Sequence, residues 1–520
     1  MSGRPWLIAQ LDAMHRSRGG DWYYRTFAPG RALAALEGVY VVNVDQAHRQ
    51  LAMILQHADV LVINGVCSVD LLPVILQRKQ AKRLSVFEIN DDVQEIQPSN
   101  PLSAFFAQPD NLRLFRRLAL SADGVQYSVP ELERLYGWLN PRGRVFLNQV
   151  VAPPPLRAAR ARPGVSIGWG GSAGHLEDIA EVAPALIAFV NAQPSVTLCL
   201  MCSDKIWSLF DALPSERKRR TPTGSIDDYY RFVAELDIGI APNRDAGFNR
   251  ARSDVKFLEY AGWGAVPVVQ RLAPYLASVR HGENGFLFDS TSGLISLLEC
   301  LVSDAAERQR VRSRAHAYVQ RERLQEQHAV ERLSFYDELM PEPAAGADPA
   351  RLFADLVALE GAEVVGRHLM LAHTRYESSL HDGLVLLQNS GEPERERGAR
   401  LLREAVALEP TQALPELFLG VQLDGEAELR SALAKNPRSV QATLALGSHF
   451  LERAQYKAAL ERFLAAAQLA PGYEMPFAYA ARAMQKLGAL KEADEFERLA
   501  QSMAGAVVPL AERVASSGQR

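Results

Sequence analysis

The sequence predicts two α/β domains in tandem, followed by a region built of helices alone. First, a chain of 520 residues exceeds what one hydrophobic core usually organises, so roughly two to four domains are expected. Second, short apolar runs alternate with helix-like segments through the first two thirds of the chain, which is typical of parallel sheets covered by helices on both faces. Third, the sequence after residue 350 is rich in Ala, Leu, Glu and Arg, and its pattern indicates helices.

Residues 1–157 are expected to form the first Rossmann-like domain. Its predicted strands are RPWLIAQL, GVYVVNV, ADVLVINGV, RLSVFEI, DGVQYSV and GRVFLNQV. The segment VVAPPPLRAARARPG (150–164) is interpreted as the linker to a second such domain over residues 158–342. There the alternation continues through VSIGWGG, SVTLCLM, LDIGIAPN, AVPVVQ and GENGFLF. Because ligands of open α/β sheets bind beyond the carboxyl ends of the strands, the cleft between the two domains is the expected place of function.

Residues 343–520 are expected to form an all-α solenoid of tetratricopeptide repeats. The segment LALGSHFLERAQYKAALERFLAAAQLAP has the residue types and spacing of that repeat at Leu446, Gly447, Phe450, Ala459, Phe463, Ala466 and Pro471. Copies that end at Pro410 and Pro437, and a later one in GALKEADEFERLAQ, extend the pattern. Stacked repeats usually present a concave groove, so a protein partner is expected for this region.

Composition and charge exclude several classes of protein. A net charge of −4 provides no dominant basic surface, so no nucleic-acid partner is expected. No apolar run approaches the roughly 20 residues that span a bilayer, and the N-terminus lacks a convincing signal peptide. We therefore expect a cytoplasmic protein with no transmembrane segment, and docking to a membrane surface stays open.

The chain has four cysteines, too few for a disulfide framework in 520 residues. Cys199 and Cys202 form a C-x-x-C motif inside an apolar run. Two buried core cysteines are favoured over a redox or zinc site, because structural zinc needs four ligands and no second pair lies nearby.

The segment RSDVKFLEYAGWGAVPVV (252–269) carries the most distinctive chemistry. Ser253 is expected to cap a helix in which Lys256 and Glu259, three residues apart, share a face. The helix N-terminus, Lys256 and Arg252 would attract a phosphate, while Glu259 would accept hydrogen bonds from two adjacent hydroxyls. From the residues alone, two interpretations stay open: a nucleotide-sugar site, or an amphipathic helix with a solvated charged face.

In its context this segment resembles the signature of the family-4 glycosyltransferases (glycosyl transferases group 1), which have the GT-B fold. Segments that fall in the order of this family are YYRTFAPGRAL (23–33), VFEINDD (86–92), SADGVQYSVPELERLYG (121–137), RVFLNQV (144–150), VSIGWGGSAGHLEDI (165–179), YYRFVAELDIGIAPN (229–243) and VRHGENGFLF (279–288). Together they cover residues 1–335, about the two predicted α/β domains.

The resemblance implies a retaining transfer of a hexose or related sugar from a nucleotide-diphosphate donor, held by the second domain, to an acceptor held by the first. It implies no bound metal or other cofactor, and it makes Lys256 and Arg252 the catalytic cations that meet the charge of the departing diphosphate. Glycines of the opening loop would let backbone N–H groups approach the phosphates. The expected donor-side residues are Gly170, Gly171, Ser172, His175, Asn243, Asn249, Ser253, Lys256 and Glu259, and the expected acceptor-side residues are Gly19, Gly20, Tyr24, Arg25, Asp91 and Asp92.

Some of these residues have a second interpretation. For the acidic turn NDD (90–92), a strand end near the acceptor is favoured over the metal-binding motif of the other glycosyltransferase fold. SRGGDWYYR (17–25) either lines the cleft or forms a structural turn, with the first favoured. His175 is interpreted as an ordinary loop histidine more readily than as a donor contact.

The sequence departs from the family at one position that matters. The family commonly has a second glutamate eight residues before the first, where it helps to hold the donor sugar, and Ala251 stands there in this chain. Asp245 or Asn249 is the candidate replacement, and Arg252 is the candidate for cations that GSAGHLED lacks. The predicted function is sugar transfer, in a bacterial cytoplasm, to a glycan or to a protein recruited by the repeats. Two alternatives remain: a scaffold that has lost turnover and binds proteins, and a nucleotide-sugar epimerase.

Overall fold

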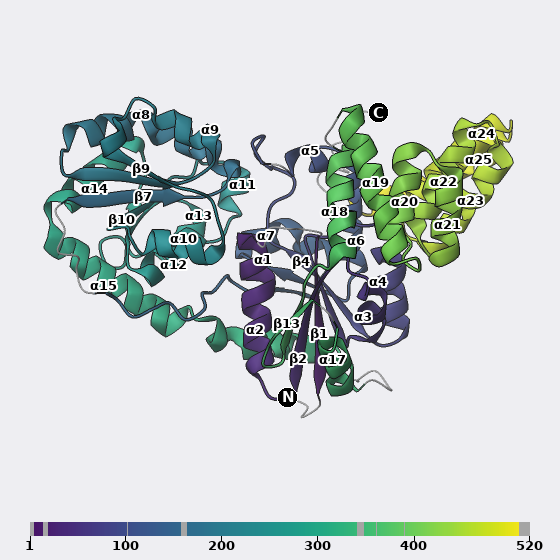
Figure 1. The fold of residues 1–520 in the computed structure, drawn as a ribbon, viewed down its shortest axis with the longest axis horizontal. Helices are drawn as coiled ribbons and strands as arrows, with labels where there is room; N and C mark the ends of the chain where they lie inside the picture. The colour runs from purple at the N-terminus through teal and green to yellow at the C-terminus, as the bar shows by residue number, and fades with distance from the viewer. Residues whose placement is uncertain are drawn as a thin grey trace.

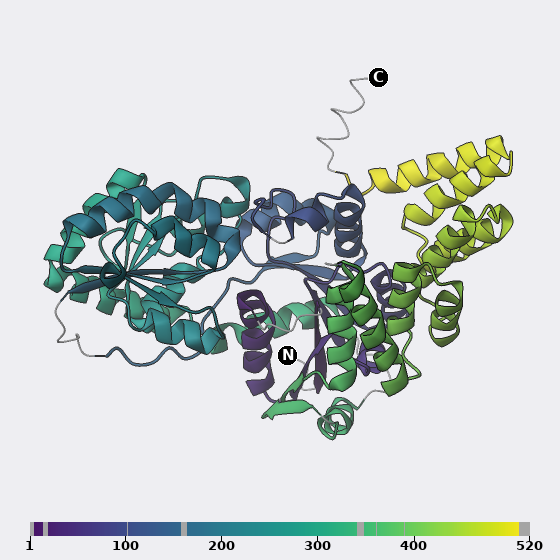
Figure 2. The same cartoon turned by 45° about the horizontal axis from the view of Figure 1, so that its top comes forward.

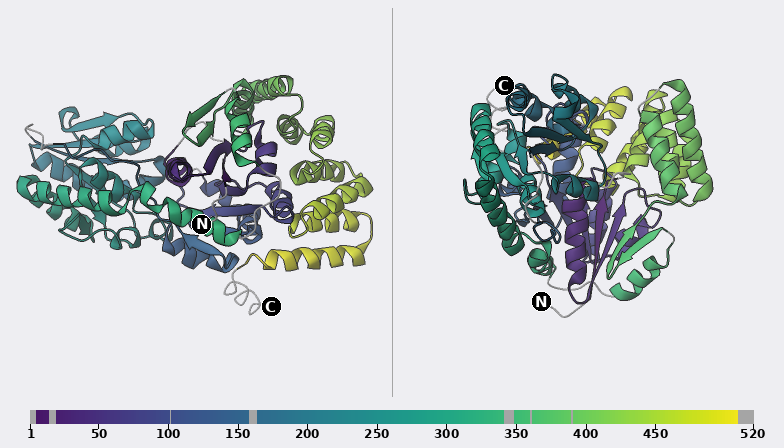
Figure 3. Two further views of the ribbon diagram at one scale, coloured as in Figure 1. Left: turned by 90° about the horizontal axis from the view of Figure 1, so that it is seen from below. Right: turned by 60° about the vertical axis from the view of Figure 1, so that its left-hand side comes forward.

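The computed structural model describes residues 5–13, 19–100, 102–157, 164–340, 348–359, 361–388 and 391–508. They form two α/β domains with separate sheets, followed by a helical region (Figure 1). The fold class predicted from the sequence is confirmed in this respect. The second α/β domain and the helical region lie on opposite sides of the first domain, as Figures 2 and 3 also show.

The first domain is built on an eight-stranded sheet of order β13-β14-β2-β1-β3-β4-β5-β6, parallel except for the β13–β14 pair. The strands are β1 (Trp6–Asp12), β2 (Val39–Asp45), β3 (Val60–Asn64), β4 (Leu84–Ile89), β5 (Gly124–Tyr127), β6 (Gly143–Val145), β13 (Ala362–Val365) and β14 (His368–Leu371). Its helices are α1 (Gly20–Trp22), α2 (Ala28–Ala35), α3 (Leu51–His57), α4 (Leu71–Gln80), α5 (Ser103–Phe106), α6 (Pro109–Ser121) and α7 (Pro130–Tyr136), with a π-helical turn at Tyr23–Phe27. Continuous apolar runs such as VLVIN in β3 are buried throughout, as expected for strands covered on both faces.

The second domain is built on a six-stranded parallel sheet of order β12-β11-β10-β7-β8-β9. Its strands are β7 (Val165–Gly170), β8 (Val196–Met201), β9 (Lys218–Thr221), β10 (Ile238–Ala241), β11 (Val266–Gln270) and β12 (Phe286–Phe288). Its helices are α8 (Leu176–Ala192), α9 (Asp204–Trp207), α10 (Ile226–Val233), α11 (Gly247–Arg250), α12 (Val255–Trp263), α13 (Ala273–Leu276), α14 (Thr291–Ser303) and α15 (Ala305–Glu322). Cys199 and Cys202 are buried in this domain, as predicted.

The chain returns to the first domain after α15. Helix α16 (Ala329–Leu339) buries Leu333, Phe335 and Tyr336 in one cluster with Trp6 and Ile8 of β1. This helix was predicted as part of the second domain, yet it packs on the first. The two α/β domains are therefore joined by two stretches of chain, one outward and one returning.

The expectation that residues 343–520 contain helices alone is wrong for its first part. Helix α17 (Pro349–Val357) is followed by a hairpin of β13 and β14, turned at Gly366 with φ +63°. Strand β14 pairs in parallel with β2 through His368, Leu369 and Met370, and so extends the first sheet. The strand gains its stability from a partner more than 300 residues earlier, which local periodicity does not reveal.

The remaining helices form antiparallel pairs that stack along one direction. They are α18 (Arg375–Gln388), α19 (Glu392–Leu408), α20 (Leu414–Leu423), α21 (Glu426–Lys435), α22 (Val440–Glu452), α23 (Tyr456–Leu469), α24 (Met475–Lys486) and α25 (Leu490–Gly505). In three pairs a glycine on the first helix faces a bulky side chain on the second. A Cβ at Gly383, Gly420 or Gly447 would lie 2.9 Å, 2.6 Å or 2.5 Å from Leu402, Leu429 or Phe463. Glycine at these places allows the close approach that each pair requires.

One edge of the helical region is bonded to the first domain, through the loops that join successive pairs. Gln412 donates to the carbonyl of Arg49 at 3.1 Å, and Ser439 donates to Asp70 at 2.8 Å. Further along, Arg113 Nε donates to Glu474 at 3.1 Å. These contacts attach the helices laterally along one edge of the stack. No helix among the described residues is long and apolar enough to cross a membrane.

Candidate active site between the two α/β domains

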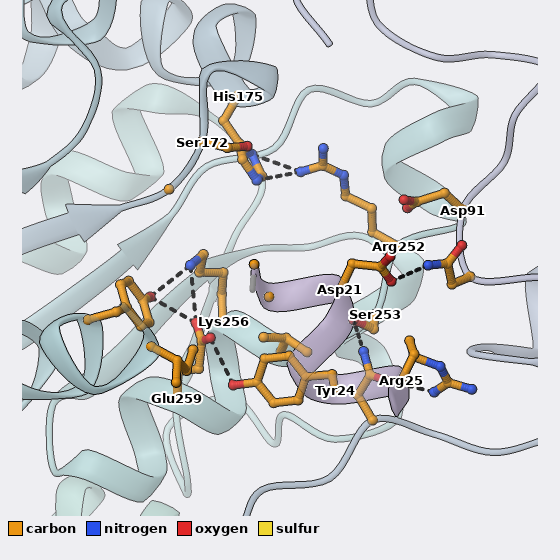
Figure 4. Close-up of a pocket in the computed structure, with 18 of the residues that line it drawn as sticks. Asp21, Tyr24, Arg25, Asp91, Ser172, His175, Arg252, Ser253, Lys256 and Glu259 are labelled. Carbon is orange, nitrogen blue, oxygen red and sulfur yellow. Dashed lines mark hydrogen bonds and ion pairs between the residues drawn. The ribbon is translucent and has the colours of Figure 1, made fainter. Parts of the chain in front are cut away.

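A cavity of about 500 Å³ opens between the carboxyl edges of the two sheets. From the first domain its walls come from the loops after β1 and β4, and from the second domain they come from the loop after β7 and the start of α12 (Figure 4). Most residues predicted for the site line it, namely Gly19, Gly20, Tyr24, Arg25, Asp91, Gly171, Ser172, His175, Asn243, Arg252, Ser253, Lys256 and Glu259. The structure thus brings together residues separated by more than 200 positions.

Helix α12 begins one residue later than the sequence suggests. Asp254 is its N-cap residue, and Ser253 precedes the cap, so the prediction that Ser253 caps the helix is wrong. The Asp254 side chain does not cap the helix either, because it accepts hydrogen bonds from Arg323 at 2.6 and 3.1 Å. Ser253 Oγ instead accepts a hydrogen bond of 2.9 Å from Asn148 of the first domain. The start of α12 is therefore held by the buried ion pair between Asp254 and Arg323, and by the Asn148 amide from the other side of the cleft.

Lys256 and Glu259 lie side by side on the face of α12 that borders the cavity. Lys256 Nζ donates to Glu259 Oε2 at 3.1 Å and to the Tyr229 hydroxyl at 2.7 Å, and it lies 4.4 Å from the centre of the Tyr229 ring. The Tyr229 hydroxyl in turn donates to Glu259 Oε2 at 2.8 Å. Lys256 stands in the first turn of the helix, where unpaired backbone N–H groups add to its positive charge. This is an arrangement that can bind an anion.

Tyr24 of the first domain reaches across the cavity to the same carboxylate. Its hydroxyl donates to Glu259 Oε1 at 2.9 Å and lies 2.9 Å from the Tyr230 hydroxyl. Both oxygens of the buried Glu259 carboxylate therefore already accept hydrogen bonds from the protein. A ligand that used Glu259 for its hydroxyls would have to compete with Tyr24. We refer to this contact between Tyr24 and Glu259 as the cleft latch.

Tyr24→Phe is expected to tighten about tenfold the binding of a ligand whose hydroxyls bond to Glu259, such as the nucleotide sugar that the sequence predicts. The substitution removes a hydrogen bond to a charged group that the ligand would otherwise have to break, and such bonds contribute about 1.5–3 kcal/mol. Calorimetric titration of the parent and the variant measures the difference. Tyr40→Phe, a half-buried tyrosine that packs on Phe353 outside the cleft, is the matched control. Equal or weaker affinity in Tyr24→Phe would contradict the competition described for the cleft latch.

Arg252 extends into the cavity between His175 and Asp91 (Figure 4). Its NH1 lies 2.5 Å from His175 Nε2, while His175 Nδ1 lies 3.0 Å from Asp178. Burial, and then the charge of Arg252, lower the pKa of His175 to about 4. A neutral His175 that donates to Asp178 and accepts from Arg252 satisfies both contacts. His175 thus orients Arg252 and contributes no charge of its own at neutral pH.

Two carboxylates of the first domain line the same cavity, and one of them, Asp91, interacts with Arg252. Burial raises the pKa of Asp91 to about 7, against the opposing effect of Arg252 and with the help of Asp21 and Asp92. No described residue donates a hydrogen bond to the Asp91 side chain. Asp21, which the sequence analysis did not single out, also lines the cavity and accepts a hydrogen bond from Asn90. An ionisable group with a perturbed pKa in a cleft is a candidate for a chemical role.

Arg25 lines the cavity, but its guanidinium is bound within the first domain. It donates to Glu88 at 2.6 and 3.0 Å and to Asn148 Oδ1 at 2.7 Å. Asn148 then donates to Ser253 across the cleft. Arg25 therefore positions Asn148, and its charge is met by a buried carboxylate. Gly19 and Gly20 border open space, where a Cβ at either would touch nothing within 4 Å.

The glycines at the end of β7, Gly170 within the strand and Gly171 after it, are required by packing. A Cβ at Gly170 would lie 2.7 Å from Tyr229, and one at Gly171 would lie 2.6 Å from Trp169. The backbone N–H of Gly171 donates to the carbonyl of Met201 at 3.0 Å. The N–H of Gly171 is therefore engaged within the protein, and the role expected of the two glycines, to let backbone N–H groups approach a phosphate, stays a prediction. Gly170 belongs to β7 and does not line the cavity.

Two other predicted site residues have structural roles. Asn249 is fully buried, and its amide donates to Asp178 at 2.8 Å and to the carbonyl of Arg244 at 2.9 Å. Asp92 is buried and accepts from the Tyr136 hydroxyl at 2.7 Å. Neither lines the cavity, and their predicted contacts with donor and acceptor stay predictions. Both side chains instead fix the loops that carry their neighbours.

The missing glutamate is not replaced by the residues that the sequence suggested. Ala251 is fully buried and outside the cavity lining. Asp245 is paired with Arg250 at 2.6 Å on the surface, and Asn249 is engaged with Asp178. The cavity carboxylate that interacts with Arg252 comes from the opposite domain, at Asp91, and Asp21 lines the cavity beside it.

The structure adds lining residues that the sequence did not single out. Tyr229 lies in a segment quoted for its strand, and Asn148 lies at the end of another. Their hydroxyl and amide meet the donor-side residues only in three dimensions. The full additional set is Asp21, Asn90, Asn100, Asn148, Met201, Thr223, Gly224, Ser225, Ile226, Tyr229, Phe248, Val255 and Tyr275.

Comparison with known proteins finds no matching family model and no matching curated protein. Among solved structures, the chain is similar to HepE from Anabaena in complex with UDP and glucose, with 16% identity over 63% of this chain and 99% of that chain and a TM-score of 0.48. It is similar to sucrose-phosphate synthase from Thermosynechococcus elongatus, with 16% identity over 65% of this chain and 99% of that chain and a TM-score of 0.47. A third similar structure is the C-terminal domain of a glycosyl transferase group 1 family protein from Francisella tularensis, with 16% identity over 31% of this chain and 88% of that domain and a TM-score of 0.26.

Proposed function

We propose that this protein transfers a sugar from a nucleoside-diphosphate sugar to the hydroxyl of an acceptor. The observation that carries the proposal is the interdomain cavity, in which Lys256, Arg252 and the start of α12 face Asp91 across the cleft. One wall is suited to a diphosphate, and the other holds a carboxylate that can accept a hydrogen bond from a hydroxyl.

On the donor side, we assign the diphosphate to Lys256 and Arg252 and the ribose hydroxyls to Glu259. Positive charge that is already oriented toward the leaving group stabilises the charge that develops as the sugar–oxygen bond breaks. Glu259 becomes available to the ribose when Tyr24 releases it. We propose that this charge stabilisation is sufficient without a resident cofactor. Retention of the anomeric configuration is proposed on the resemblance of the sequence to family-4 glycosyltransferases, and a cytoplasmic location on its composition.

On the acceptor side, we assign Asp91 to the attacking hydroxyl. Its ionised carboxylate accepts a hydrogen bond that orients the hydroxyl toward the anomeric carbon. The departing diphosphate, held by Lys256 and Arg252, takes up the proton. The acceptor is a protein or a glycan.

The proposed role of Asp91 predicts a pH dependence. Because the pKa of Asp91 is raised to about 7, its carboxyl is mostly protonated below pH 6 and mostly ionised above pH 8. The rate of transfer is therefore expected to rise with pH through about 7. Asp91→Asn is expected to be slow and to lose this rise, while Asp110→Asn, an exposed residue of α6, keeps the profile of the parent. An unchanged pH profile in Asp91→Asn would remove Asp91 from the mechanism.

The central test is incubation of the purified protein with a panel of nucleotide sugars, followed by measurement of released nucleoside diphosphate. Release that depends on one donor supports the proposal. An epimerase would convert its donor into the epimeric nucleotide sugar, which chromatography of the same samples detects. A protein-binding scaffold would bind no nucleotide in calorimetry. Either result would overturn sugar transfer.

A further inference from the structure

A second cavity, of about 780 Å³, lies between the first α/β domain and the helical region. It shares no lining residue with the interdomain cavity. On the side of the first domain it is bordered by α3, α4 and the loops after β2 and β3, including Gln46 and Ser68. These loops emerge at the same carboxyl edge of the sheet as the β1 and β4 loops of the interdomain cavity. The second cavity extends along α3 and α4 as far as Arg83, just before β4, and its other end lies at the sheet edge on which the interdomain cavity opens.

Hydrogen bonds between the first domain and the helical region lie on both sides of this second cavity. On one side Gln412 donates to the carbonyl of Arg49 at 3.1 Å, and on the other Asp70 accepts from Ser439 Oγ at 2.8 Å and from the backbone N–H of Gln441 at 2.9 Å. The cavity therefore lies between two groups of hydrogen bonds that join the first domain to the helical region. Its volume lies within the range of about 300–1,000 Å³ that is typical of ligand sites.

The lining combines aliphatic surface with side-chain amides. The apolar side chains include Leu51, Leu55, Val74, Leu414, Leu417 and Phe418, and the amides are Gln46, Gln56, Gln77, Gln412, Asn436 and Gln441. Gln412 donates to the carbonyl of Arg49, Asn436 accepts from the backbone N–H of Arg438, and Gln77 accepts from the Arg438 guanidinium. An amide has an acceptor oxygen and two donor hydrogens, so the groups that stay open match the C=O and N–H groups of a polypeptide main chain. Aliphatic walls suit apolar peptide side chains, whereas they leave the hydroxyls of a sugar without partners. The lining therefore favours a peptide over a glycan.

The charges in the lining are mostly positive. Arg78, Arg83, Lys435 and Arg438 stand against a single acid, Asp70. Arg78 donates to backbone carbonyls, and Lys435 pairs with Glu416 at 2.7 Å. Arg438 is exposed, its guanidinium donates to the side-chain oxygen of Gln77, and it forms no ion pair with any described residue. An occupant that carries a carboxylate would pair with it, because arginine binds carboxylates with two parallel hydrogen bonds.

We propose that this second cavity binds an extended peptide segment of the acceptor protein, with apolar side chains and at least one acidic residue. That the peptide belongs to the acceptor rests on the proposed function, whereas the binding of a peptide in this cavity does not. A segment held there would be anchored at the edge of the sheet that also presents Asp91 to the donor.

The test uses the full chain without nucleotide, panned against a phage-displayed library of random dodecapeptides. Enriched sequences are synthesised, and their dissociation constants are measured by fluorescence anisotropy. Ala52→Trp fills the cavity from an exposed position of its lining, and Arg438→Ala removes the lining cation that has no ion-pair partner in the described part of the chain. Gln56→Ala with Gln441→Ala removes two amides whose side chains bond to no described residue. The matched control is Gln80→Ala, on α4 but outside the lining.

Acidic, apolar peptides are expected to be enriched on the parent. Ala52→Trp is expected to abolish binding, and Arg438→Ala to weaken it about tenfold with a smaller dependence on salt. Gln56→Ala with Gln441→Ala is expected to weaken binding without changing its salt dependence, and Gln80→Ala to leave it unchanged. Failure to enrich any peptide, binding that survives Ala52→Trp, or glycan-array binding that Ala52→Trp removes would overturn the proposal. Because no nucleotide is present, such a failure is distinct from failure to release nucleoside diphosphate from a sugar donor.

Discussion

Replacing Lys256 with alanine is expected to lower kcat/KM for the nucleotide sugar by about 10²- to 10³-fold, the loss typical of one oriented group that stabilises developing charge. The side chain supplies a charge at the start of α12, and it also neutralises Glu259 at 3.1 Å. Without it, a buried carboxylate would face the incoming diphosphate with no adjacent cation. Both effects act in the same direction, so affinity for the nucleoside diphosphate should fall together with the rate.

Lys205→Ala is the matched control for this experiment, because Lys205 is an exposed lysine of the same domain outside the cavity. It should retain the kinetics of the parent. Thermal unfolding of both variants checks that the fold is intact. If Lys256→Ala released nucleoside diphosphate at the rate of the parent, the diphosphate would have to bind elsewhere.

Replacing Arg323 with alanine is expected to destabilise the protein by about 3–5 kcal/mol, the loss typical of breaking one buried ion pair. Arg323 donates to both oxygens of Asp254, at 2.6 and 3.1 Å, and to the carbonyl of Asn148 at 2.8 Å. Both partners of the ion pair are almost fully buried. The substitution would leave the Asp254 carboxylate without its cation at the very start of α12. A lower midpoint of thermal unfolding and weaker nucleotide binding are expected together.

Arg321→Ala controls for the loss of an arginine from the same stretch of chain. Its side chain is 67% exposed and pairs with Glu322, so its removal should shift the midpoint by little. Equal unfolding midpoints for Arg323→Ala and Arg321→Ala would show that the buried pair does not hold α12 in place.

The sequence was informative wherever the chemistry lay within one segment. Lys256 and Glu259 share a helical face at three-residue spacing, and the structure places both on the cavity. Alternating apolar runs predicted two parallel sheets, because strands buried on both faces are apolar throughout. Spacing also indicated helical pairs at the end of the chain, where Gly447 meets Phe463.

Features that depend on distant partners could not be predicted in this way. The cleft latch joins Tyr24 to Glu259 over 235 positions, and the pairing of β14 with β2 links residues at opposite ends of the first domain's sequence.

The role of Gly171 was predicted from its type, yet Trp169 and the carbonyl of Met201 determine it. Ser253 has the residue type of a helix cap, but the bond that Asp254 makes with Arg323 and the amide of Asn148 decide how α12 begins.

The most direct test of the account is a crystal structure of the full chain with a nucleoside diphosphate bound. The account predicts the diphosphate within hydrogen-bond distance of Lys256 Nζ and the first turn of α12, the ribose hydroxyls on Glu259, and the Tyr24 hydroxyl displaced from that carboxylate. A nucleotide bound outside the interdomain cavity, or one bound there with Tyr24 still donating to Glu259 and the ribose elsewhere, would contradict it.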